Sequence, residues 1–151
     1  MGAATATVRS KTGGGVRPDE LRAALDQALA ASDADESIGP RIRATGLRMR
    51  FDLPDAAIVL YVRAGDGGES NLVWSFDEAP DWRPRLELEM SAEVANRYLQ
   101  GRESLAIAIA RGQVRCRGES RAALAYLPAA RLICEPYRRV IAAGFPDLVA
   151  A

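Results

Sequence analysis

The feature that most constrains the fold of this chain is a strict alternation of apolar and charged residues in two short segments. Residues 47–53 read LRMRFDL and residues 85–90 read RLELEM, so that every second side chain is apolar. This period of two predicts β-strands that bury one face and leave the other in water. The apolar faces need cover, and we expect helices to provide it on one side of the sheet. The solvated side is expected to be a salt-bridged surface formed by Arg48, Arg50, Glu87 and Glu89.

The rest of the chain supplies further strands and the covering helices. Two apolar runs flank the turn at residues 65–68 and predict a hairpin. Pro18 opens a helix with apolar residues at helical spacing, and Ser91 stands where a helix N-cap belongs. A short helical turn is expected near residues 41–44. Further strands are expected at residues 57–64, 70–76 and 113–117, and helices at 18–31, 91–100, 103–111 and from 120 onward, with Pro128 kinking or restarting the last helix.

The composition is that of an ordinary globular domain. The chain has 151 residues, which favours one domain, and 48% of them are hydrophobic. Residues 1–17 are small, polar and glycine-rich and predict a disordered tail, whereas residues 18–151 form the domain. The formal net charge is zero, so no nucleic-acid partner is expected. No apolar run is long enough to cross a membrane and no signal peptide is recognised, so a cytoplasmic location is expected.

Few residues in the chain suit catalysis. It contains no histidine, which removes the commonest general base and metal ligand. Cys116 and Cys134 lack the spacing of a metal or redox motif and are interpreted as reduced core residues. No metal and no cofactor are therefore expected. Acid–base chemistry by a carboxyl or a phenol stays open, although each candidate also suits a surface or capping role; these candidates are Asp52, Asp77, Glu119 and Tyr98.

An ordered set of short motifs between residues 85 and 125 resembles a known family. A strand ends in Met90-Ser91, a helix ends at Gly101, a second short helix ends at Gly112, and a strand ends at Gly118. A helix with Ala122, Ala123 and Leu124 follows. This order resembles the sterol carrier protein 2 (SCP-2) sterol-binding domain family, and the resemblance extends over roughly residues 18–135.

The resemblance implies an α+β (α/β) domain with a five-stranded, mostly antiparallel sheet, helices packed on one face and an apolar cavity between them. Members of the family bind sterols, fatty acids or acyl-CoA. A filled core is the alternative for the same apolar residues, because protein interiors are close-packed. The residues expected to point into the cavity are Met49, Phe51, Leu60, Val62, Trp74, Leu88, Met90, Val94, Tyr98, Ile107, Ile109 and Leu124.

Three hypotheses about function follow. The first is a carrier that binds a hydrophobic small molecule without covalent chemistry. The second is an enzyme, such as a cyclase or isomerase of a lipophilic metabolite, that uses a carboxyl or tyrosine in the same cavity. The third is a protein-interaction module with a filled core. The loop around Trp82 and the C-terminal segment, residues 136–151, are candidates for transient contact with a membrane or a protein, or alternatively pack on their own domain.

Overall fold

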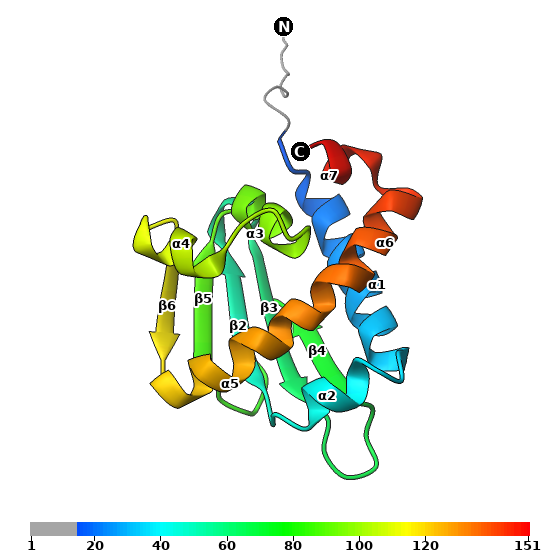
Figure 1. Cartoon of the computed structure of the whole chain (residues 1–151), viewed down its shortest axis with the longest axis vertical. Helices are drawn as coiled ribbons and strands as arrows, with labels where there is room; N and C mark the ends of the chain where they lie inside the picture. The colour runs from blue at the N-terminus through cyan, green and yellow to red at the C-terminus, as the bar shows by residue number, and fades with distance from the viewer. Residues whose placement is uncertain (1–14) are drawn as a thin grey trace, which may run out of the picture.

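The computed structural model describes residues 15–151 and contains a five-stranded sheet in the order β4-β3-β2-β5-β6 (Figure 1). The central strand β2 pairs antiparallel with β3 and parallel with β5, and the two outer pairs are antiparallel. This confirms the predicted α+β architecture and its mostly antiparallel sheet. The strands are β2 (Arg48–Leu53), β3 (Ile58–Ala64), β4 (Leu72–Phe76), β5 (Leu86–Met90) and β6 (Val114–Gly118).

The helices lie on one face of this sheet, as predicted (Figure 1). Helix α1 buries an apolar stripe, and α6 packs beside it. The longer helices are α1 (Pro18–Ala34), α3 (Ala92–Leu99), α5 (Ser120–Ala130) and α6 (Cys134–Gly144). The shorter ones are α2 (Gly39–Arg43), α4 (Leu105–Ala110), α7 (Pro146–Ala150) and the 3₁₀ turns η2 (Pro54–Ala56) and η3 (Arg131–Ile133). None of the described helices is long and apolar enough to span a bilayer.

The opposite face of the sheet is polar, as the alternation predicted. In the parallel register of β2 and β5, Arg50 lies beside Glu87, and their side chains form an ion pair of 3.2 Å. Arg50 also lies 3.4 Å from the carboxylate of Asp52 on its own strand. Because these side chains are only partly buried, each pair contributes little to stability, and the pattern mainly fixes which face stays in water.

Local sequence signals set the ends of α3 and α4. The Ser91 hydroxyl accepts a hydrogen bond of 3.1 Å from the backbone N–H of Val94, which is the predicted N-cap. Gly101 and Gly112 follow the two helices with φ of +78° and +75°. Glycine adopts this left-handed conformation without the clash of a Cβ atom, so it ends a helix sharply.

The helix does not restart at Pro128, which was one of the two effects predicted for this proline. Helix α5 continues through Pro128 to Ala130, and the interruption is the single 3₁₀ turn η3 that precedes α6. The proline ring removes only the hydrogen bond that residue 128 would donate to Leu124, and this part of α5 is exposed to water. Pro136 lies in the first turn of α6, where a backbone N–H has no helical partner in any case.

The two segments proposed for external contacts both pack against their own domain. The Trp82 ring packs edge-to-face on Tyr61, with 6.1 Å between ring centroids. Tyr61 alternates along β3 with Leu60 and Val62 and therefore faces away from the helices, so Trp82 packs on the sheet face opposite the helical cover. The C-terminal segment packs on its own domain, where Leu148 is buried.

The predicted tail lies mostly outside the described residues, which begin at residue 15. Val16, which the prediction also placed in the tail, packs partly against the core.

Candidate ligand cavity and adjoining groove

A small apolar cavity lies between the sheet and its helical cover. Its volume is about 40 Å³. All of its lining side chains are apolar except for one tyrosine hydroxyl. The sheet contributes Phe51, Leu53, Leu60, Val62 and Met90, and the helices contribute Leu25, Leu29, Ala95, Tyr98, Leu99, Ala130 and Ile133.

The spacing of residues along α3 explains how its side chains reach the cavity. Tyr98 and Leu99 follow Ala95 by three and four residues, the intervals that place side chains on one face of a helix. Phe51 approaches the same space from β2 and is partly exposed although it lies on the covered face of the central strand.

The cavity is far smaller than a lipid. In the same measure a single water needs about 10–15 Å³, and pockets for drug-sized ligands are about 300–1,000 Å³. The ligand cavity that the sequence predicted is therefore not established by this space and stays a prediction. A sterol or an acyl chain fits only if the walls of the cavity move apart. The helical wall is the one that can move, because no inter-strand hydrogen bonds hold it in place.

The residues predicted to point into the cavity divide into several groups. Those that line it are Phe51, Leu60, Val62, Met90 and Tyr98. Three others lie in the close-packed core without lining it: Met49, Leu88 and Val94. Trp74 and Ile109 are only partly buried against the core. The inward orientation expected for Ile107 and Leu124 is wrong, because their side chains are 50% and 79% exposed. No ligand contact of any of these residues is tested, and their role in binding stays a prediction.

The sequence reasoning missed most of the helical wall. Leu25 and Leu29 belong to the stripe of α1, whose spacing of four residues was visible in the sequence. The sequence does not place Leu25 and Leu29 at the cavity, because nothing in that stripe shows which part of the sheet α1 covers. Trp74, by contrast, was expected in the cavity; its indole N–H instead donates a hydrogen bond of 2.8 Å to Asp26 on α1.

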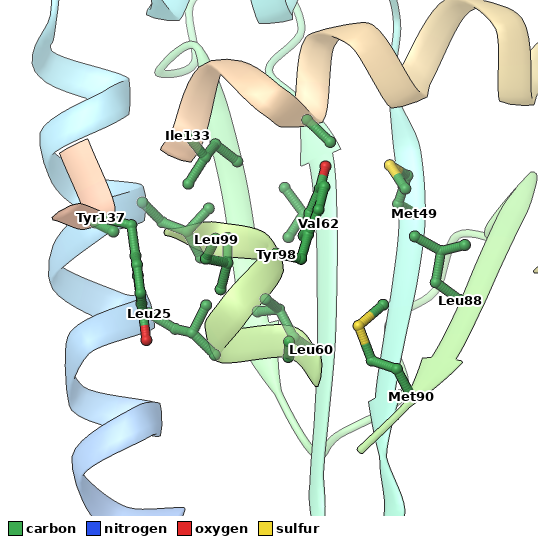
Figure 2. Packing of buried hydrophobic residues seen from close by; sticks show 14 of the residues in the cluster. Leu25, Met49, Leu60, Val62, Leu88, Met90, Tyr98, Leu99, Ile133 and Tyr137 are labelled. Atoms are coloured by element: carbon green, nitrogen blue, oxygen red, sulfur yellow. The ribbon is translucent and has the colours of Figure 1, made fainter. Parts of the chain in front are cut away.

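Tyr98 is the polar exception in the lining, and its hydroxyl is buried with no hydrogen-bond partner among the described residues. Figure 2 shows its ring between α3 and the strand that carries Leu60 and Val62, with the hydroxyl directed toward α5. Burial raises the pKa of Tyr98 well above its ordinary value, so the hydroxyl stays protonated and is a hydrogen-bond donor. An unsatisfied buried hydroxyl costs about 1–3 kcal/mol.

A larger groove lies on the other side of Tyr98, which lines both spaces. It has a volume of about 900 Å³ and runs between α2, the α3–α4 loop and the segment from the end of α5 into α6. Apolar side chains such as Leu105, Leu127 and Leu132 form part of its wall. The charged side chains that line it are Arg41, Arg102, Arg131, Arg138, Glu103 and Glu135.

The carboxyls considered for acid–base chemistry lie away from the cavity. Asp52 lies on the polar face of the sheet beside Arg50, and Asp77 accepts hydrogen bonds from Arg22 and from the N–H of Val59. Glu119 pairs with Arg85 at 2.8 Å. The hydrogen bonds from arginine lower the pKa of both Asp77 and Glu119, which keeps them ionised and unsuited to donate a proton.

Both cysteines are free, as predicted. Burial raises the pKa of the Cys116 thiol and of the Cys134 thiol, so both stay protonated and pack as small apolar groups. The Cys134 thiol donates a hydrogen bond of 3.5 Å to the carbonyl of Tyr98, which joins α6 to α3 at the boundary between cavity and groove. Within residues 15–151, no cluster of acidic or cysteine side chains is arranged to hold a metal ion.

Comparison with solved structures shows that this architecture is an SCP-2-like fold. The chain is similar to the ubiquinone synthesis protein UbiJ-SCP2, with a TM-score of 0.52, 16% identity, and 79% of this chain and 96% of that chain covered. It is similar to sterol carrier protein 2, with a TM-score of 0.51 and 14% identity over 77% of this chain and 94% of that one. It is also similar to a conserved protein from Thermus thermophilus that is described as possibly a sterol carrier protein. The TM-score is again 0.51, with 21% identity, and 86% of this chain and 92% of that chain are covered.

The likeness also extends to part of a larger enzyme. The chain covers 14% of the stereoselective inverting sec-alkylsulfatase Pisa1 from Pseudomonas sp., with 60% of this chain covered, a TM-score of 0.50 and 10% identity. No protein-family model and no curated protein sequence match the chain. At these identities the likeness establishes the fold, and the function must be argued from the cavity and the groove.

Proposed function

We propose that this protein binds and carries a hydrophobic small molecule, such as a sterol, a fatty acid, an acyl-CoA or another lipophilic metabolite, without covalent chemistry and in the cytoplasm. The observation that carries the proposal is the cavity between sheet and helices, whose lining is apolar apart from the Tyr98 hydroxyl. Burying the apolar surface of a ligand there provides roughly 25 cal/mol per Å² before the entropic costs of binding.

The proposal requires the cavity to expand when a ligand enters. The sheet side is held by continuous strand pairing, whereas the helical side is a set of separate segments joined by short turns. The wall formed by Tyr98, Ala130 and Ile133 belongs to three such segments, α3, α5 and η3. Movement of these helical segments is therefore the simplest route to a larger space.

A second candidate is a protein-interaction module with a filled core. The observation that favours it is the small size of the cavity, about 40 Å³, which is close to ordinary packing. Such a module would use the polar sheet face, where Trp82 packs on Tyr61. Uptake of a neutral lipophile into the interior separates the two candidates, because a filled core takes up none.

The test measures binding of the neutral fluorophore N-phenyl-1-naphthylamine to the full chain and to Ala95→Leu. Ala95 lines the cavity, so a leucine there fills it and should abolish the fluorescence enhancement. Ala30→Leu is the matched control, because Ala30 is an exposed residue of α1. Saturable binding by the wild type and by A30L, lost in A95L, supports the carrier. Absence of binding by the wild type, or equal binding by A95L, overturns it.

A further inference from the structure

The arginines of the groove described above are not neutralised by the acids beside them. Glu103 accepts hydrogen bonds from Arg97, at 3.1 Å from its Nη2 atom, and Glu135 accepts one of 2.7 Å from Arg139. Neither Arg97 nor Arg139 lines the groove. Both acids of the groove are therefore already paired with arginines that lie outside it.

Three of the arginines that line the groove are free to meet an anion, namely Arg41, Arg131 and Arg138. Arg138 donates to the backbone carbonyl of Gln100, which is a neutral acceptor. Within residues 15–151, neither Arg41 nor Arg131 takes part in a salt bridge of 4.0 Å or less. The groove thus combines an excess of positive charge with partly apolar walls.

Tyr98 connects this charged groove with the apolar cavity. It is only 5% exposed, it lines both spaces, and its hydroxyl has no partner among the described residues. Arg131 lines the same groove as Tyr98, at the start of the turn that leads from α5 into α6. The Tyr98 hydroxyl is therefore an unsatisfied hydrogen-bond donor between the apolar cavity and the arginine-lined groove. It is suited to bind the first polar atom of a ligand that extends from the cavity into the groove.

We propose that the ligand is an anionic amphiphile, whose charged group binds in the groove to Arg41 and Arg131 while its apolar chain passes Tyr98 into the cavity. The Tyr98 hydroxyl donates to the polar atom where chain and charged group meet. This inference rests on the proposed function and narrows it, because a neutral sterol makes no use of the groove. Guanidinium groups form charge-assisted hydrogen bonds with carboxylates and phosphates alike. The charged group of the ligand is therefore defined by its anionic oxygen atoms, which both groups have.

Three probes separate the contributions of chain and charge: dodecyl phosphate, 1-dodecanol and inorganic phosphate, each titrated calorimetrically into the full chain below its micelle concentration. We expect dodecyl phosphate to bind at least about tenfold more tightly than 1-dodecanol, and its affinity to fall as salt is added. The double variant Arg41→Gln/Arg131→Gln should remove this advantage and leave 1-dodecanol binding unchanged. Y98F should weaken dodecyl phosphate binding severalfold.

The control is Arg115→Gln/Arg117→Gln, which removes the same charge from exposed positions on β6 and should bind all three probes as the wild type does. Equal affinities for dodecyl phosphate and 1-dodecanol overturn this inference and leave the carrier function standing. Binding of inorganic phosphate as tight as that of dodecyl phosphate also overturns it, since the groove is then a site for a free anion. If neither long-chain probe binds, the inference and the carrier function fail together.

Discussion

The Tyr137 hydroxyl donates a hydrogen bond of 2.8 Å to the Oδ1 atom of Asn96, and both side chains are completely buried. The Nδ2 atom of Asn96 donates in turn to the carbonyl of Leu148 at 2.9 Å, so one amide joins α3, α6 and α7. Gln100, one turn further along α3, donates to the same carbonyl at 3.0 Å. The C-terminal helix is thereby fixed to the helix that carries Tyr98.

Tyr137→Phe should destabilise the protein by about 1–3 kcal/mol. The substitution keeps the ring and its packing but leaves the Oδ1 atom of Asn96 buried without a donor. Urea unfolding at neutral pH, followed by tryptophan fluorescence, measures the change in the free energy of unfolding.

Tyr98→Phe is the matched comparison for Tyr137→Phe, because both tyrosines are buried and only the hydroxyl of Tyr98 lacks a partner among the described residues. Removing a hydroxyl without a partner should leave the free energy of unfolding unchanged or raise it by up to about 1 kcal/mol. A loss in Y98F as large as that in Y137F would show that the Tyr98 hydroxyl is bonded after all, for example to an ordered water.

Stability should fall steeply in alkaline solution. Burial raises the pKa of Tyr98 and of Tyr137 in the folded protein above the ordinary value of about 10, so above that pH the unfolded chain binds fewer protons than the folded one. Each tyrosine then lowers the free energy of unfolding by about 1.4 kcal/mol per pH unit, and the contribution is fully retained below about pH 10. Urea unfolding between about pH 8 and 11.5 should show a shallower decline for Y98F than for the wild type. Equal slopes would mean that Tyr98 ionises normally.

Ser91→Ala should cost about 1 kcal/mol, because the N–H of Val94 loses the hydroxyl that accepts its hydrogen bond at the start of α3. Ser91→Asp keeps an acceptor at the N-cap and should retain most of the stability. The measurement is again the urea midpoint, with the m-value as a check that the unfolded state is unchanged. If S91A and S91D unfold at the same urea concentration, the cap does not contribute to stability.

Much of the fold could be predicted because its signals are local. Alternation in residues 47–53 and 85–90 identified two central strands and their polar face, and the pairing of Arg50 with Glu87 follows from it. Ser91 and Gly101 marked the two ends of α3 to within about one residue. Each of these signals depends only on residues that are close together in the sequence, so it can be recognised without knowing the fold.

The site was harder to predict because it depends on how separate elements meet. The cavity is a small mismatch between α1, α3, η3 and the sheet, and its size follows from packing that no periodicity encodes. The arginines of the groove come from segments far apart in the chain, such as Arg41 on α2 and Arg131 on η3, so their sequence positions suggested nothing in common. Tyr98 was identified from α3 alone, because its position on the apolar face of a short helix is a local property.

The orientation of α5 gives a direct test of where local reasoning failed. The resemblance suggested that Leu124 faces the sheet, yet its side chain is 79% exposed, whereas Leu88 on β5 is 1% exposed. Leu124→Ala should therefore change the free energy of unfolding by less than about 0.5 kcal/mol, as expected for a surface substitution. The identical change at Leu88 should cost about 2–5 kcal/mol, because it removes buried contacts and leaves a void. Urea unfolding of the two variants gives the comparison, and a loss in L124A close to that in L88A would place Leu124 under the helical cover instead of on its surface.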